Sequence, residues 1–142
     1  MSEAMPQEQG TRIAFSFPAE PESISEVRHL IVSEAQTLPF TADDLDDIAL
    51  AISETFTNLV QYAPGYRIRG SCIVTPGQLE VRFEVEQNIA PYLGQRQFPS
   101  GLSHSGRGVP LLNLLIPQVD LQQRSDDTWE LRLIKPVPRN MR

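Results

Sequence analysis

Glu54 and Asn58 are the residues of this chain whose types and spacing best suit chemistry. They are four positions apart in a segment with helical periodicity, so their side chains lie one turn apart on the same face. A carboxylate and a carboxamide stacked in this way could hold a hydrated metal ion and polarise a hydroxyl or a water. An arbitrary pair of this kind is usually only a solvated helix face, so the pair needs a second motif to become informative.

A glycine-rich motif lies far downstream of that pair, at Gly106-Arg107-Gly108-Val109-Pro110-Leu111. It precedes a short helix that we expect over 109–116. Glycines before a helix let backbone N–H groups approach an anion, and the helix N-terminus favours negative charge. Alone, Gly-Arg-Gly is most often an ordinary turn. Together, the two motifs point to a phosphate-bearing ligand.

A long helix must position Glu54 and Asn58, and it begins at a predicted capping box of Thr41 and Asp44. We expect it to end near Ala63, and to place the pair on nearly the opposite side from its apolar stripe. That stripe consists of Leu45, Ile48, Ile52, Phe56, Leu59 and Ala63.

The remaining elements follow from periodicity and from the positions of proline, glycine and capping residues. We predict a strand over 11–17, a helix that begins at a Ser23/Glu26 capping box and ends at Pro39, a hairpin of 66–75 with 79–86, a long connection over 87–106, and a closing hairpin of 119–123 with 129–134. This order indicates an α+β fold, a two-layer sandwich with helices on one face of a mixed, mostly antiparallel sheet.

Composition narrows the function classes. The 142 residues include 12 Lys and Arg against 18 Asp and Glu, a net charge of −6 that argues against general nucleic-acid binding. Cys72 is the single cysteine, so an internal disulfide or a thiolate metal cluster is excluded. No apolar run is long enough to span a membrane, and the polar, acidic start is unlike a secretory signal. We expect a disordered leader over 1–10, a single domain over 11–142 and a cytoplasmic protein.

From about Ile13 to Ile134 the chain resembles the GHKL (Bergerat-type) ATP-binding fold, and within it the anti-sigma factor serine kinases of the RsbW type. That family's N box has Glu, then Asn four residues later, then commonly His-Ala. Glu54, Asn58 and Ala63 match it, and Tyr62 stands at the His position. The resemblance implies that Asn58 ligates Mg²⁺ bound to ATP phosphates, with Glu54 as the general base toward a partner's serine hydroxyl.

The glycine-rich motif is similar to the family's Gly-Arg-Gly-Leu-Gly-Leu box, with Pro110 replacing the third glycine and removing a possible phosphate donor. The resemblance makes 90–105 the ATP lid. It also implies a set of Mg-ATP-binding residues, namely Asn58, Gly106, Arg107, Gly108, Val109 and Leu111.

The chain departs from the family in a third motif. The family has Asp-x-Gly-x-Gly after a strand, where the Asp accepts a hydrogen bond from the adenine amino group. No such motif occurs over 83–90. Gln87 or Asn88 could still bond adenine, although neither supplies a carboxylate, and Ile89 leaves less room for the base.

Three functions follow from the resemblance. The first is an anti-sigma factor that binds a sigma factor and phosphorylates a STAS-type antagonist on serine. The second is a nucleotide-independent, catalytically degenerate binding module of the same fold. The third is a kinase of another partner-switching pathway that acts on a stressosome-like scaffold. Homodimers are frequent in the family and are expected here, without nucleic-acid or membrane partners.

Overall fold

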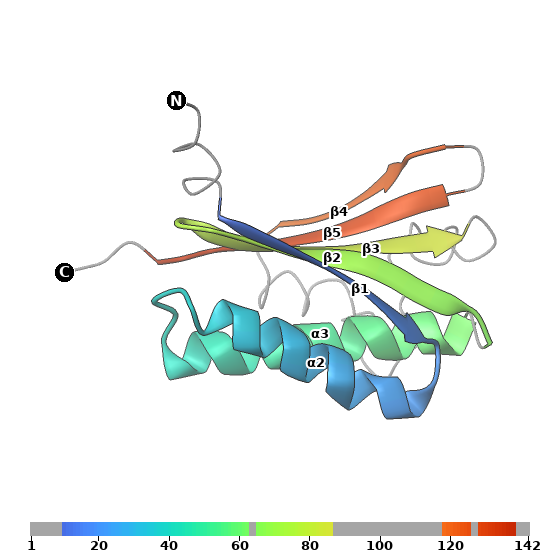
Figure 1. Ribbon diagram of the computed structural model, residues 1–142, viewed down its shortest axis with the longest axis horizontal. Helices are drawn as coiled ribbons and strands as arrows, with labels where there is room; N and C mark the ends of the chain where they lie inside the picture. The colour runs from blue at the N-terminus through green and yellow to red at the C-terminus, as the bar shows by residue number, and fades with distance from the viewer. Residues whose placement is uncertain (1–9, 63–64, 87–117, 126–127, 139–142) are drawn as a thin grey trace, which may run out of the picture.

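The computed structural model describes residues 10–62, 65–86, 118–125 and 128–138. Figure 1 shows the strands and helices within these ranges. In chain order they are β1 (Thr11–Pro18), α2 (Pro21–Ala35), α3 (Ala42–Tyr62), β2 (Arg67–Thr75), β3 (Gln78–Glu86), β4 (Gln118–Gln123) and β5 (Thr128–Pro136). Neither helix is long and apolar enough to cross a membrane, as judged over these ranges.

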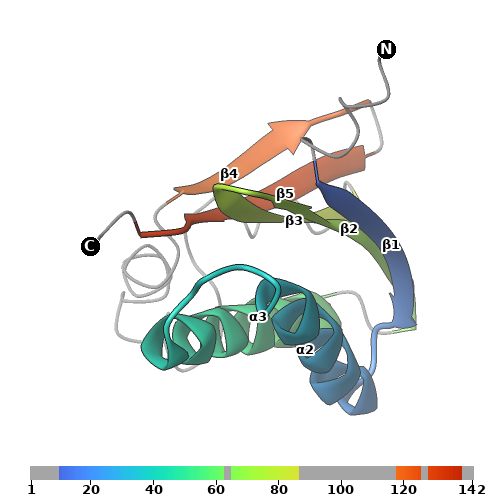
Figure 2. The ribbon, with the colours of Figure 1, turned by 60° about the vertical axis from the view of Figure 1, so that its left-hand side comes forward.

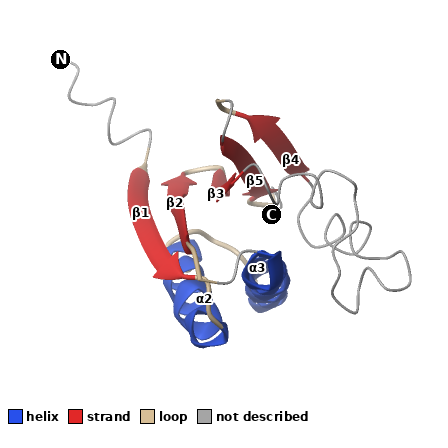
Figure 3. Cartoon of the chain, turned by 90° about the vertical axis from the view of Figure 1, so that its right-hand side faces the viewer, coloured by secondary structure: helices blue, strands red, loops and turns tan. Residues whose placement is uncertain are grey.

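The strands form one sheet in the order β1-β2-β3-β5-β4, and both helices lie side by side on one face of it (Figures 1 and 3). This arrangement confirms the predicted α+β sandwich. Each of the four pairings between described strands is antiparallel. The two predicted hairpins are also confirmed, because β2 pairs with β3 and β4 pairs with β5. The sheet twists strongly from β1 to β4 (Figure 2).

The start of α3 is set by the predicted capping box. The backbone N–H of Asp44 donates to Thr41 Oγ1 at 3.1 Å, and the N–H of Thr41 donates to Asp44 Oδ2 at 3.0 Å. These two bonds satisfy N–H groups that would otherwise lack partners at the helix terminus. Asp44 and Asp47 also lie 3.9 and 3.8 Å from Lys135 Nζ on β5, so the acidic first turns join the helix to the sheet.

The start of α2 differs from the prediction. The helix begins at Pro21 after the N-cap Glu20, and the predicted capping box of Ser23 and Glu26 does not form. Proline is well suited to the first helical position because its missing N–H has no intrahelical partner there. Ser23 therefore falls inside the first turn, where it is buried instead of capping the helix.

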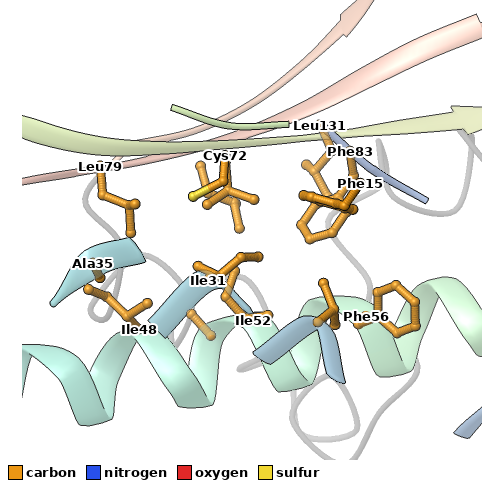
Figure 4. Close-up of a cluster of buried hydrophobic side chains, with 14 of the residues drawn as sticks. Phe15, Ile31, Ala35, Ile48, Ile52, Phe56, Cys72, Leu79, Phe83 and Leu131 are labelled. Carbon is orange, nitrogen blue, oxygen red and sulfur yellow. The ribbon is translucent and has the colours of Figure 1, made fainter. Parts of the chain in front are cut away.

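The core lies between the helices and the sheet. Figure 4 shows side chains of the sheet, such as Cys72 and Phe83, directed toward those of the helices, such as Ile31 and Ile52. Most of the predicted α3 stripe is fully enclosed, with exposures of 1% or less for Ile48, Ile52, Phe56 and Leu59. The helical periodicity therefore identified the sheet-facing side of α3.

The opposite face of the sheet is charged. Arg82 Nε lies 2.7 Å from Glu80 Oε2 on the same strand, β3. Its Nη1 lies 3.9 Å from Glu130 Oε2, which links β3 to the neighbouring strand β5. Arg132 Nε approaches the same Glu80 oxygen at 3.5 Å. Glu80 is only 8% exposed, so this face is covered by its own long side chains. The part of this face around Glu80 is thus polar but closely packed.

Candidate functional site

The orientation of α3 is defined by its contact with α2. Arg28 Nη1 of α2 donates to Ser53 Oγ at 3.1 Å, and Ala49 borders a groove of about 700 Å³ whose other described lining residues belong to α2. Ala49 and Ser53 therefore mark the flank of α3 that faces α2. Glu54 and Asn58 each come five residues later than one of these, a rotation of about 140° around the helix. The candidate pair thus lies on the flank turned away from α2.

The pair is less exposed than the sequence predicted. Asn58 is only 2% exposed and Glu54 is half-buried, so the expectation that both lie on nearly the opposite side from the core is wrong for Asn58. The buried arc of α3 extends beyond the apolar stripe and includes Ala51 and Thr55. The stripe of large apolar residues marks only the side of a helix that faces the sheet. When neighbouring segments also cover the flank of the helix, smaller and polar residues beside the stripe are buried as well.

Two buried oxygen atoms on this flank lack partners. Within the described ranges, neither Asn58 Oδ1 nor Thr55 Oγ1 makes a hydrogen bond. Leaving a buried polar group unpaired costs about 1–3 kcal/mol, and such groups usually have a partner, an ordered water or a ligand. An amide oxygen is also the type of hard donor that Mg²⁺ prefers, with few protein ligands and the rest supplied by water and phosphate. The chemistry of Asn58 therefore fits the metal role.

Sequence reasoning assigned no role to Thr55. The sequence did indicate that Thr55 is buried, because Thr55 stands three positions before Asn58 and four after Ala51, within the buried arc of the helix. Thr55 is 1% exposed. Around the helix the order is therefore Glu54, Asn58, Thr55 and then the sheet-facing stripe, and exposure falls along this order.

The glycine-rich half of the predicted site lies outside the described residues. This applies to Gly106, Arg107, Gly108, Val109 and Leu111, to the expected lid over 90–105, to the short helix over 109–116, and to the adenine-side candidates Gln87 and Asn88. Within the described residues, the site consists of one flank of α3.

The fold and its site-bearing helix α3 match a known protein family. The model described as "Histidine kinase-like ATPase domain" matches residues 17–135. This chain belongs to that family. The match spans both motifs and all the elements from α2 through most of β5, and it confirms the resemblance to the GHKL fold.

Relatives of this chain are named as bacterial serine-protein kinases. The chain is 32% identical over 130 residues to the serine-protein kinase RsbW of Bacillus velezensis, covering 82% of this chain and 81% of that one. It is 28% identical over 130 residues, with the same two coverages, to the serine-protein kinase RsbW of Bacillus subtilis. These identities extend over most of both chains, so they include α3 and the two motifs.

A solved structure shows the same fold. In the crystal structure of the SiaB-SiaC complex from Pseudomonas aeruginosa, one chain superposes with a TM-score of 0.57. The match covers 95% of each chain at 15% identity. At that identity, the comparison supports the fold of this family member.

Proposed function

We propose that this protein is a serine-protein kinase of a bacterial partner-switching system, which binds Mg-ATP and phosphorylates a STAS-type protein on serine. The observation that supports this most directly is the buried Oδ1 of Asn58, which has no partner among the described residues and lies one helical turn from the half-buried carboxylate of Glu54. The names of the RsbW relatives support the reaction class. The SiaB-SiaC complex, which contains a chain of this fold, supports assembly with a protein partner.

In this proposal Asn58 and Glu54 have separate tasks. Asn58 Oδ1 holds the metal ion, which when bound neutralises charge on the phosphates. Glu54 accepts the proton of the partner's serine hydroxyl. The serine oxygen then forms a bond to the γ-phosphorus, and the bond from that phosphorus to the β–γ bridging oxygen breaks, which leaves ADP. Half-burial suits Glu54 for this task because the serine must reach it from outside.

The glycine-rich residues complete the proposed nucleotide site. Gly106, Arg107 and Gly108 are proposed to bring backbone N–H groups to the phosphates, with Val109 and Leu111 beside them. A sigma factor is the proposed regulated partner, and a homodimer is the proposed assembly.

Calorimetric titration with ATP, with and without Mg²⁺, tests the nucleotide part of the proposal. We expect magnesium-dependent binding that Asn58→Ala removes, with little change in the free energy of unfolding, because the side chain that is lost carries a buried oxygen without a partner among the described residues. Asn140→Ala, a change of the same type beyond the residues that the family model matches, provides the matched control. Transfer of labelled phosphate from ATP to a serine of a STAS-type protein then tests the reaction.

Absence of binding at millimolar nucleotide would contradict the kinase proposal. That result would favour the alternative function, a nucleotide-independent binding module that regulates a sigma factor or another signalling partner. The specific feature in its favour is the missing Asp-x-Gly-x-Gly motif over 83–90. Repeating the titration with a STAS-type partner present excludes a site that only the complex completes.

A further inference from the structure

The hydroxyl of Thr55 is a buried polar group for which the described part of the fold provides no partner. Threonine within a helix commonly donates to the backbone carbonyl one turn earlier, which here belongs to Ala51. Thr55 Oγ1 makes no such bond, nor any other hydrogen bond to a described residue, while the side chain is 1% exposed. Valine has the same shape and would avoid the cost of an unpaired hydroxyl. The oxygen therefore indicates a bound partner that the described residues do not supply.

The position of Thr55 relative to Asn58 indicates which part of a ligand it meets. The two residues are three apart in α3, so their Cβ atoms are about 5–6 Å apart and their side chains point about 60° apart. Glu54 lies on the other side of Asn58. The half-buried carboxylate is thus outermost, the amide is next, and the hydroxyl is innermost, toward the sheet.

A nucleotide that lies along the series Glu54, Asn58 and Thr55 would place one chemical group at the outer end of the series and another at the inner end. The proposed function assigns the phosphates and the metal ion to the outer pair, Glu54 and Asn58. The group that reaches the innermost position is then the base. A threonine hydroxyl donates one hydrogen bond and accepts others, so it can pair with an exocyclic amino group or with a ring nitrogen. In this chain such a residue would compensate for a missing motif, because the sequence over 83–90 lacks the Asp-x-Gly-x-Gly motif whose Asp accepts from the adenine amino group.

We propose that Thr55 is a specificity-determining residue that hydrogen-bonds the adenine of the bound nucleotide through its buried hydroxyl. This inference rests on the proposed nucleotide-binding function and extends it to a residue that the N-box pattern of Glu54 and Asn58 does not include.

Two nucleotides and two variants of the full chain test the proposal. Calorimetry would compare ATP with purine riboside triphosphate, which lacks the amino group of adenine, for the unaltered protein, Thr55→Val and Thr55→Ser. We expect the unaltered protein to prefer ATP. Thr55→Val should weaken ATP binding about three- to tenfold and reduce that preference, whereas Thr55→Ser should keep it because the hydroxyl remains. Thermal unfolding without ligand should show Thr55→Val at least as stable as the original.

The outcomes separate this inference from the function on which it rests. If ATP binds and Asn58→Ala abolishes binding while Thr55→Val does not change it, the role of Thr55 is wrong and the nucleotide site stands. An equal loss for both nucleotides that disappears without Mg²⁺ would also overturn the role, because the hydroxyl would then bond a water on the metal ion. If the unaltered protein binds no nucleotide, the proposed function and this inference fall together.

Discussion

The rings of Phe56 on α3 and Phe83 on β3 lie with their centroids 6.3 Å apart at an interplanar angle of 57°. Both side chains are fully buried. Phe56 is two positions from Glu54 and two from Asn58, so this contact is one of those that hold the site-bearing part of α3 against the sheet. The candidate site therefore depends on a packing contact that takes no part in its chemistry.

Phe56→Ala should lower the free energy of unfolding by about 3–5 kcal/mol, because it deletes a fully buried ring and leaves a cavity. Urea denaturation measures the change. Leu50→Ala on the same helix is the matched control, since Leu50 is 44% exposed and its loss should change stability by less than about 0.5 kcal/mol. Equal effects of the two changes would show that Phe56 is not a core residue.

Gly70→Ala should destabilise the protein by about 1–3 kcal/mol through overpacking. A Cβ atom at Gly70 would lie 2.6 Å from Phe15 Cζ and closer still to the backbone oxygen of Arg82. Gly77→Ala tests the same change where a Cβ atom would meet nothing within 4 Å. Thermal unfolding should separate the two variants by several degrees. A Gly70→Ala protein as stable as Gly77→Ala would mean that β2 can shift relative to β1 and β3 to admit the methyl group.

Thr41→Ala should cost about 1 kcal/mol, because it removes the oxygen that accepts the N–H of Asp44 at the start of α3. Thr41→Ser keeps this oxygen and should retain most of the stability. Guanidinium denaturation of both variants provides the measurement. A serine variant as unstable as the alanine variant would assign the effect to the lost methyl group instead of the cap.

Glu54→Gln should lower the rate of phosphate transfer to a serine of the partner by about 10²–10⁴-fold, because the amide cannot accept the hydroxyl proton. Binding of Mg-ATP, measured separately by calorimetry, should persist. Glu26→Gln on the exposed side of α2 is the matched control and should leave transfer unchanged. Transfer at the normal rate by Glu54→Gln would exclude Glu54 as the general base.

Cys72 should be unreactive in the folded protein. Burial, with a smaller contribution from the charge of Glu34, raises the pKa of its thiol from 9.0 to about 12. A thiol reagent at pH 8 should therefore label the protein only after denaturation. Rapid labelling without denaturant would show that Cys72 is accessible.

The same pKa shift predicts a pH dependence of stability. Above pH 9 the unfolded chain loses the thiol proton while the folded protein keeps it, so the free energy of unfolding should fall as pH rises from about 9 toward 12. The decline from this group is at most about 1.4 kcal/mol per pH unit. Cys72→Ala should show a shallower decline over that range, and an identical pH profile would contradict the shift.

The elements of the described fold, and the first turn of the helix that bears the site, could be predicted from local sequence patterns. The stripe through Ile48, Ile52, Phe56 and Leu59 predicted the buried side of α3, and the residues Thr41 and Asp44 predicted its first turn. These features are local, because a period and a cap depend on residues a few positions apart. The Glu54 and Asn58 spacing was readable for the same reason.

The burial of those residues and their interaction partners depend on the tertiary structure. It buried Asn58, which the helical period had placed away from the core, and it enclosed Thr55 without giving its hydroxyl a partner among the described residues. It also covered Glu80 on the outer face of the sheet through arginines of two neighbouring strands. Burial and partnership depend on segments distant in the chain, so a local pattern of residues does not contain them.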